Sequence, residues 1–141
     1  MLRLIVPTLT LLLAIPFCAQ AASKQDYELS KMLDKVAAES SVGTPRAINE
    51  NILDQGYTVE GKELVDHLSV LPSHAVQMRE NPDAVRTQLG SSVCNNDGFR
   101  QLMAKGALLK YEFTEYKTNK LITTQEIKAA DCAAKPPAHK K

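Results

Sequence analysis

The first 21 residues constrain the rest of the chain most, because they have the pattern of a secretory signal peptide. A single basic residue, Arg3, precedes an apolar run from Leu4 to Phe17, and an Ala-x-Ala sequence follows. Prolines at positions 7 and 16 interrupt the run, which is also shorter than the roughly 20 residues of a membrane-spanning helix. We therefore expect cleavage before Ala22 and export of the remainder.

Cys18 raises the alternative of a lipid-anchored protein. A bacterial lipid-attachment site requires a small residue directly before the cysteine, whereas Pro16 and Phe17 precede Cys18. We therefore assign Cys18 to the removed signal peptide.

The remaining chain, residues 22–141, has the length of one small domain. Without Arg3 it carries 16 basic and 16 acidic residues, and three of the lysines lie in the last seven positions. We expect a single domain over residues 22–134 and a basic disordered tail over residues 135–141. A body without excess positive charge excludes nucleic acid as a partner. No membrane span is expected once the signal peptide is removed.

Two cysteines, Cys94 and Cys132, remain after cleavage. An even cysteine count in an exported chain predicts a disulfide, which would stabilise the domain by about 4 kcal/mol in the chain-entropy model. A catalytic thiol is the alternative, but free thiols are readily oxidised in such a compartment.

The first half of the domain has the pattern of a helix followed by a hairpin. Apolar residues at helical spacing predict a helix from about Ser23 to Ser41. Apolar residues between Ile52 and Val70 then flank Gly61, which predicts two strands joined by a tight turn.

The second half has the pattern of further helices and a second hairpin. Residues 72–90 predict either two short helices or one helix kinked at Pro82, with Ser73 and Asn81 as candidate caps. Asn95 or Asn96 would cap the next helix, and residues 109–114 and 121–127 alternate as strands. The order α-ββ-αα-ββ predicts an α+β fold, with an antiparallel four-stranded sheet and helices packed on one face.

The chain shows no pattern that identifies a catalytic or metal site. The histidines and cysteines lack the short spacings of a zinc site, and no phosphate-binding glycine pattern occurs. We therefore expect no catalytic residue, no metal and no cofactor. The alternative is a small periplasmic hydrolase, in which Ser91 or Ser92 would act with His67 or His74.

Leu108 and Tyr116 are the candidate partner-binding residues. Both fall on the outward-facing positions of the predicted strand near residues 109–114, together with Lys110, Glu112 and Thr114. Apolar side chains among charged ones on an outer face are typical of a contact with another protein, although cover by a neighbouring helix is the alternative.

The chain also resembles a known family over most of its length, from about Val42 to Cys132. The segments that carry the resemblance are LGSSVCNN (89–96), FRQLMAKGA (99–107), YEFTEYKTN (111–119), DQGYTVEG (54–61) and DHLSV (66–70). They resemble the small exported proteins of pseudomonads called "putative quorum-sensing-regulated virulence factors". The resemblance implies an α+β exported protein without established enzymatic activity, with a link to virulence or secretion and a shape like that of secretion chaperones.

The pair Cys94 and Cys132 matches the paired cysteines of that family. A looser resemblance is to secretion-system pilotins, in which a cysteine, a short helix, a glycine and a tyrosine-containing strand come in a similar order. We therefore expect a periplasmic or secreted, non-enzymatic protein that binds another protein or has a chaperone-like role in secretion. A pilotin-like assembly factor is the alternative.

Overall fold

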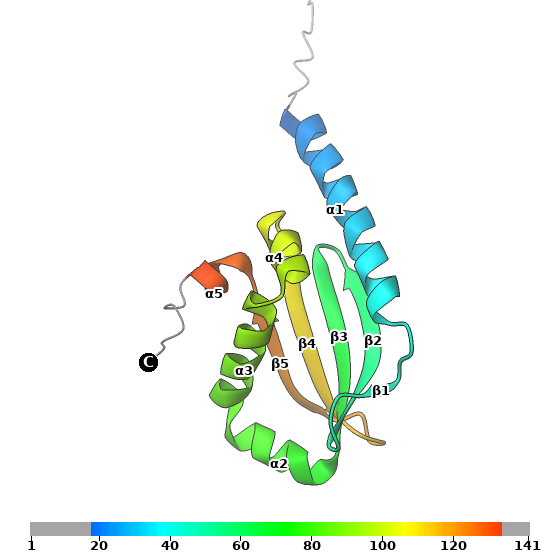
Figure 1. Cartoon of the computed structure of the whole chain (residues 1–141), viewed down its shortest axis with the longest axis vertical. Helices are drawn as coiled ribbons and strands as arrows, with labels where there is room; N and C mark the ends of the chain where they lie inside the picture. Colours follow the sequence, from blue (N-terminus) through cyan, green and yellow to red (C-terminus); the bar gives the residue numbers. More distant parts are fainter. Residues whose placement is uncertain (1–17, 134–141) are drawn as a thin grey trace, which may run out of the picture.

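The computed structural model describes residues 18–133, and their side chains from residue 24 onward. The elements, in chain order, are α1 (Cys18–Ser40), β1 (Arg46–Ala47), β2 (Ile52–Glu60), β3 (Glu63–Val70), α2 (Pro72–Glu80), α3 (Pro82–Cys94), α4 (Asp97–Ala104), β4 (Leu108–Glu115), β5 (Leu121–Ile127) and α5 (Ala129–Ala133) (Figure 1). Most of the expected signal peptide and the whole basic tail over 135–141 lie outside the described residues.

The strands form one sheet in the order β1-β2-β3-β4-β5. Neighbouring strands are antiparallel except β3 and β4, which run parallel with Glu63 opposite Leu108 and Val70 opposite Glu115. The prediction of a four-stranded antiparallel sheet was therefore wrong in strand number and in one direction. The reason is that α2, α3 and α4 carry the chain back to the end of the sheet where β3 begins, as a parallel pair requires.

Two short elements were not predicted. β1 contains only two residues, too few for an alternating pattern, and it adds a fifth strand by pairing Arg46 with Asp54 and Ala47 with Leu53. The second is α5, a single turn of helix that follows the last strand. The α+β class and both hairpins agree with the sequence analysis.

The core lies between the helices and one face of the sheet, which we call the inner face. Alternate residues of β3 (Leu64, Leu68) and β4 (Leu109, Phe113) are buried there. The helices supply the other side of the same cluster, with Leu29 and Leu33 from α1, Ala75 and Met78 from α2, Val93 from α3, and Leu102 and Met103 from α4. The N-terminal half of α1 extends past the ends of the strands (Figure 1).

Two prolines and one asparagine cap mark where the helices α2, α3 and α4 begin. Pro72 opens α2 directly after Leu71, so Ser73 is not the cap that the sequence suggested. Pro82 likewise separates α2 from α3, which resolves the alternative in favour of two helices. Of the two asparagines before α4, Asn96 is the cap, because its Oδ1 accepts a hydrogen bond of 3.0 Å from the backbone N–H of Phe99.

A disulfide joins Cys94, the last residue of α3, to Cys132 in α5. The two cysteines that the sequence analysis paired are therefore bonded to each other. The bond fastens the segment after β5 to the helical layer. None of the helices over residues 18–133 is both long and apolar enough to cross a membrane.

Candidate functional site

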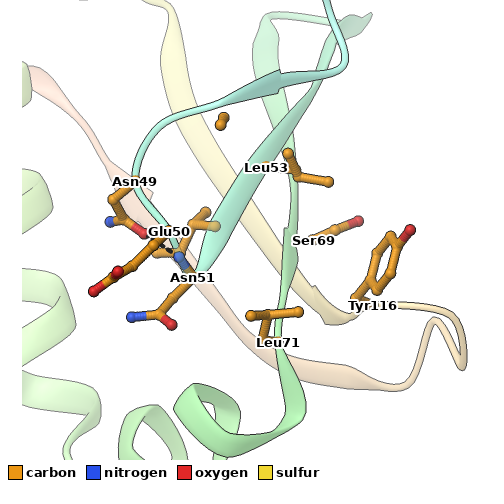
Figure 2. A pocket seen from close by; sticks show the side chains of 9 residues that line it. Asn49, Glu50, Asn51, Leu53, Ser69, Leu71 and Tyr116 are labelled. Atoms are coloured by element: carbon orange, nitrogen blue, oxygen red, sulfur yellow. Dashed lines mark hydrogen bonds between the residues drawn. The ribbon is translucent and has the colours of Figure 1, made fainter.

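A groove at one end of the sheet contains Tyr116, one of the two candidate binding residues. It has a volume of about 330 Å³, and we call it the Tyr116 groove; it is lined by Ala47, Asn49, Glu50, Asn51, Ile52, Leu53, Ser69, Leu71 and Tyr116. Figure 2 shows Leu53, Ser69 and Tyr116 on one side of β3, with the asparagines of the β1–β2 loop on the other. Residues from three separate parts of the sequence, 47–53, 69–71 and 116, therefore meet at this place.

Residues 49–51 of the groove wall belong to a tight connection between β1 and β2. The Asn49 side chain accepts a hydrogen bond of 2.8 Å from the backbone N–H of Asn51, and the N–H of Ile48 bonds to the carbonyl of Ile52 at 2.9 Å. Asparagine favours such turns because its side chain satisfies backbone groups nearby. The carbonyl of Asn51 in turn accepts from the N–H of Leu71 at 3.0 Å, which joins the loop to the start of α2.

Tyr116 is held in place through its backbone while its ring remains accessible. Its N–H donates to the carbonyl of Val70 at 2.8 Å, which continues the β3–β4 pairing by one residue. The preceding residue, Glu115, forms an ion pair with Arg79 of α2. Tyr116 and Leu71 are each 39% exposed. The groove thus has an anchored backbone and two partly exposed apolar side chains.

Leu108, the other candidate, lies at the opposite end of β4. Since β4 spans Leu108–Glu115, the two residues are separated by about 26 Å at the usual rise of a strand. Leu108 lines a different, mostly polar depression that includes Arg86, Lys128 and Asp131. The structure therefore does not bring the two candidate binding residues together in one site.

Both edges of the sheet are partly covered by side chains. On β5, Arg79 donates to the carbonyl of Leu121 at 3.1 Å and Arg86 donates to the carbonyl of Glu126 at 2.9 Å. On the part of β2 beyond the two residues that pair with β1, the Ser41 hydroxyl accepts from the N–H of Tyr57 at 2.8 Å and donates to its carbonyl at 3.3 Å. Occupied edge groups disfavour the addition of a strand from another protein.

The face of the sheet away from the helices, the outer face, carries a row of polar contacts. Lys110 lies 3.7 Å from both Glu63 and Glu112, and Glu112 lies 3.5 Å from His67 Nδ1. His67 Nε2 is 2.7 Å from the Thr58 hydroxyl. This row crosses β2, β3 and β4 and accounts for the polar residues that alternate with the core.

The residues of the hydrolase alternative are only partly brought together. His67 is on the outer face of the sheet, whereas Ser92 of α3 lies over the inner face. His74 and Ser92 line the same cavity between the sheet and helices α2 and α3, and Ser91 does not line it. The structure thus leaves His74 and Ser92 as the one pair of the four residues that shares a cavity.

Sequence reasoning missed a pair of buried carboxyl groups. Asp54 and Asp66 are only 2% and 3% exposed and belong to the adjacent strands β2 and β3. Burial raises the pKa of Asp66 to about 8, and hydrogen bonding to Asp54 and the charge of Asp54 raise it as well. A hydrogen bond from Tyr57 and the charge of Arg46 act in the opposite direction.

Two tyrosines complete this cluster. Burial, followed by the nearby Asp66 carboxyl, raises the pKa of both Tyr57 and Tyr111 above the ordinary value of a phenol. The sequence did contain a signal, because Asp66 stands two residues from Leu64 and two from Leu68 in an alternating strand. That position is expected to face the core. Over the described residues, no group of three or more acidic, histidine or cysteine side chains could hold a metal ion.

The fold and the site together define a class of small α+β proteins, in which helices cover one face of a mixed sheet and a disulfide fastens the C-terminal segment to the helices. The family model described as "Putative quorum-sensing-regulated virulence factor" matches residues 22–133. The chain therefore belongs to this family, as the resemblance in the sequence indicated.

Solved structures with the same fold include a "putative secreted protein" of Pseudomonas aeruginosa. It is 68% identical, with a TM-score of 0.74, and the match covers 77% of this chain and 96% of that one. The type 2 secretion system pilotin of Vibrio vulnificus matches at 14% identity and a TM-score of 0.67, over 78% of this chain and 96% of that one.

The type II secretion system pilotin of Vibrio cholerae matches at 15% identity and a TM-score of 0.64, over 79% of this chain and 99% of that one. At these identities, the two pilotins show a common fold only. A search of curated proteins finds no match.

Proposed function

We propose that this protein is exported and acts by binding another protein, in a chaperone-like role associated with secretion, and that it is not an enzyme. The observation that carries the proposal is the Tyr116 groove. The exposed side chains of Tyr116 and Leu71 line it together with the apolar residues Ile52 and Leu53, and Asn49 and Glu50 add polar groups. Apolar centres with polar rims and aromatic anchors are typical of protein–protein interfaces.

The covered edges of the sheet favour this groove over strand addition as the mode of binding. Arginine side chains occupy two carbonyls of β5, and Ser41 occupies the backbone groups of Tyr57 on β2. A partner would therefore insert apolar side chains between Leu71 and Tyr116 rather than extend the sheet.

The names of related proteins support a role in the cell envelope or outside the cell. The family is described as a virulence factor, and the 68%-identical structure is described as a secreted protein. A pilotin-like assembly role is the second candidate, because two pilotins share the fold.

Site-specific crosslinking tests the proposed binding surface. We would replace Tyr116 by a photoreactive phenylalanine analogue, and in a matched variant replace the exposed Thr124 of β5. Irradiation of native cells should give one adduct from position 116 and none from position 124. A peptide from the crosslinked region of that partner should then bind the purified protein, and Tyr116→Ala should weaken binding at least tenfold.

Two results would contradict the proposal: equal adducts from positions 116 and 124, or a peptide that binds the Tyr116→Ala variant as tightly as the original protein. The intact, non-reduced mass of the native protein separates the two candidate roles. A chain that starts at Ala22 supports an unanchored exported protein, whereas a lipid-modified chain that starts at Cys18 supports the pilotin-like role.

A further inference from the structure

A second cavity lies between the inner face of the sheet and helices α2 and α3. It has a volume of about 390 Å³ and shares only Asn49 and Ile52 with the Tyr116 groove. Its walls are mostly apolar, with Leu68, Met78, Val85, Leu89 and Phe113. Cavities of this size with apolar walls and few polar groups are typical of sites for small molecules.

One carboxyl oxygen in the wall lacks a hydrogen-bond partner, although Asp54 and Tyr57 lie beside the same carboxyl group. Asp66 lines the cavity and is only 3% exposed, and its Oδ1 has no hydrogen-bond partner among the described residues. Buried carboxyl oxygens are nearly always hydrogen-bonded, because an unsatisfied one loses its interactions with water without replacement. An open cavity beside such an oxygen indicates that a ligand supplies the missing donor.

We propose that this cavity binds a small amphipathic primary amine, with its apolar body against Leu68, Met78 and Phe113 and its ammonium group at Asp66. Amine binding here requires no partner in the Tyr116 groove.

The charges around Asp66 favour a cation over an anion. Asp54 and Tyr57 face it from β2 and Tyr111 from β4, and each presents oxygen atoms. Arg46 of β1 is the nearby permanent cation, but it is exposed and does not line the cavity. His74 of α2 is the one basic side chain in the lining, which contains no lysine or arginine. An anionic ligand would therefore meet the Asp66 carboxyl group, with Asp54 beside it and no lysine or arginine in the lining.

Binding of an amine should depend on pH in a defined direction. Because burial and Asp54 hold the pKa of Asp66 at about 8, an ammonium group must displace a proton from Asp66 at lower pH. The affinity for the amine should therefore rise about tenfold per pH unit between pH 6 and pH 7. The affinity for an uncharged analogue should not change.

Calorimetric titration of the purified, oxidised protein with three six-carbon probes tests the proposal. The probes are n-hexylamine, n-hexanol and hexanoate, which share the apolar body and differ in the head group. We expect hexylamine to bind at least tenfold more tightly than hexanol at pH 7.5, and hexanoate not to bind. Asp66→Asn should remove the preference for the amine and retain the binding of hexanol.

Neighbouring serines of α3 provide a matched pair of variants. Ser92 lines the cavity and is exposed at its mouth, whereas Ser91 is exposed and does not line it. Ser92→Trp should block hexylamine and hexanol, and Ser91→Trp should bind both normally. The proposal is overturned if hexylamine does not bind, if it binds no more tightly than hexanol, or if Ser92→Trp leaves binding unchanged. These measurements remain decisive even if Asp66→Asn does not fold.

Discussion

At the scale of single residues, the buried carboxyl pair is the least expected feature of the protein. Asp54 accepts a hydrogen bond of 2.8 Å from the N–H of Gly56, at a point where the β2–β3 register shifts by one residue. This irregularity is where β2 departs from simple alternation. Asp66 has no comparable backbone donor and remains protonated to a higher pH than an ordinary aspartate.

The elevated pKa of Asp66 predicts how stability depends on pH. In the unfolded chain, Asp66 loses its proton near pH 4, whereas in the folded protein it keeps the proton until about pH 8. The folded state therefore binds more protons across this range, and the contribution of Asp66 to stability falls as pH rises from about 4 to 8. Between pH 5 and pH 7, the contribution of Asp66 to the free energy of unfolding should fall by about 1–3 kcal/mol, and the Asp66→Asn variant should lack this decrease.

Urea unfolding at several pH values measures this effect. Glu60→Gln, at an exposed position of β2, is the control and should keep the original pH dependence. An Asp66→Asn variant with the same pH dependence as the original protein would show that Asp66 is ionised in the folded state at neutral pH.

At the scale of elements, the caps define the boundaries of the helices that form the crossover from β3 to β4. Asn96 is the N-cap of α4, and α4 places Leu102 and Met103 in the core. Asn81 stands at the junction of α2 and α3, but its side chain donates to the carbonyl of Gln77 instead of capping α3. Asn81 and Asn96 thus both directly precede a helix, but only the Asn96 side chain caps the helix that follows it.

Removal of the Asn96 cap should destabilise the protein. Asn96→Ala deletes the acceptor for the N–H of Phe99, and a lost cap of this kind costs about 1 kcal/mol. Thermal unfolding followed by circular dichroism measures the loss. The neighbouring Asn95, whose backbone N–H bonds to the carbonyl of Ser91, provides the control, and Asn95→Ala should have the smaller effect. Equal losses would indicate that the Asn96 side chain is not the cap in solution.

At the scale of the whole molecule, the disulfide connects the helical crossover to the C-terminal segment. Cys94 and Cys132 are 38 residues apart, and β4 and β5 lie between them. Arg86 of α3 reinforces this connection by donating to Asp131 at 3.2 Å. The chain after β5 is therefore held against α3 by a covalent bond and a charged hydrogen bond.

Loss of either cysteine should have the same consequence. Cys94→Ala and Cys132→Ala should each lower the free energy of unfolding by about 2–4 kcal/mol, because each removes the same constraint on the unfolded chain. The double variant should be no less stable than either single variant. Denaturant unfolding of the three variants measures this, and additive losses would argue against a bond between the two cysteines.

Local sequence patterns accounted for much of the fold. Apolar residues on both sides of a turn at Gly61 predicted the β2–β3 hairpin, and alternation in residues 109–114 predicted β4. The same patterns could not reveal how the two hairpins pair with each other. That choice depends on the path of α2, α3 and α4, and therefore on contacts between residues far apart in the sequence.

The candidate site was predictable only in part. The exposure of Tyr116 followed from its position after an alternating strand. Its separation from Leu108 followed once β4 was known to begin at Leu108 and to end directly before Tyr116. The groove itself also needs the turn at Asn49 and the packing of Leu71, which no periodicity near Tyr116 encodes.

The sequence alone determined the hairpins, most of the helices, the available cysteine pair and the family, since these depend on residues close together or on short recognisable segments. The tertiary structure alone decided the parallel pairing of β3 with β4, the Tyr116 groove, and the meeting of Asp54 with Asp66 beside a cavity. Each of these depends on how the helices pack against the sheet, and packing joins side chains whose separation in the sequence carries no local signal.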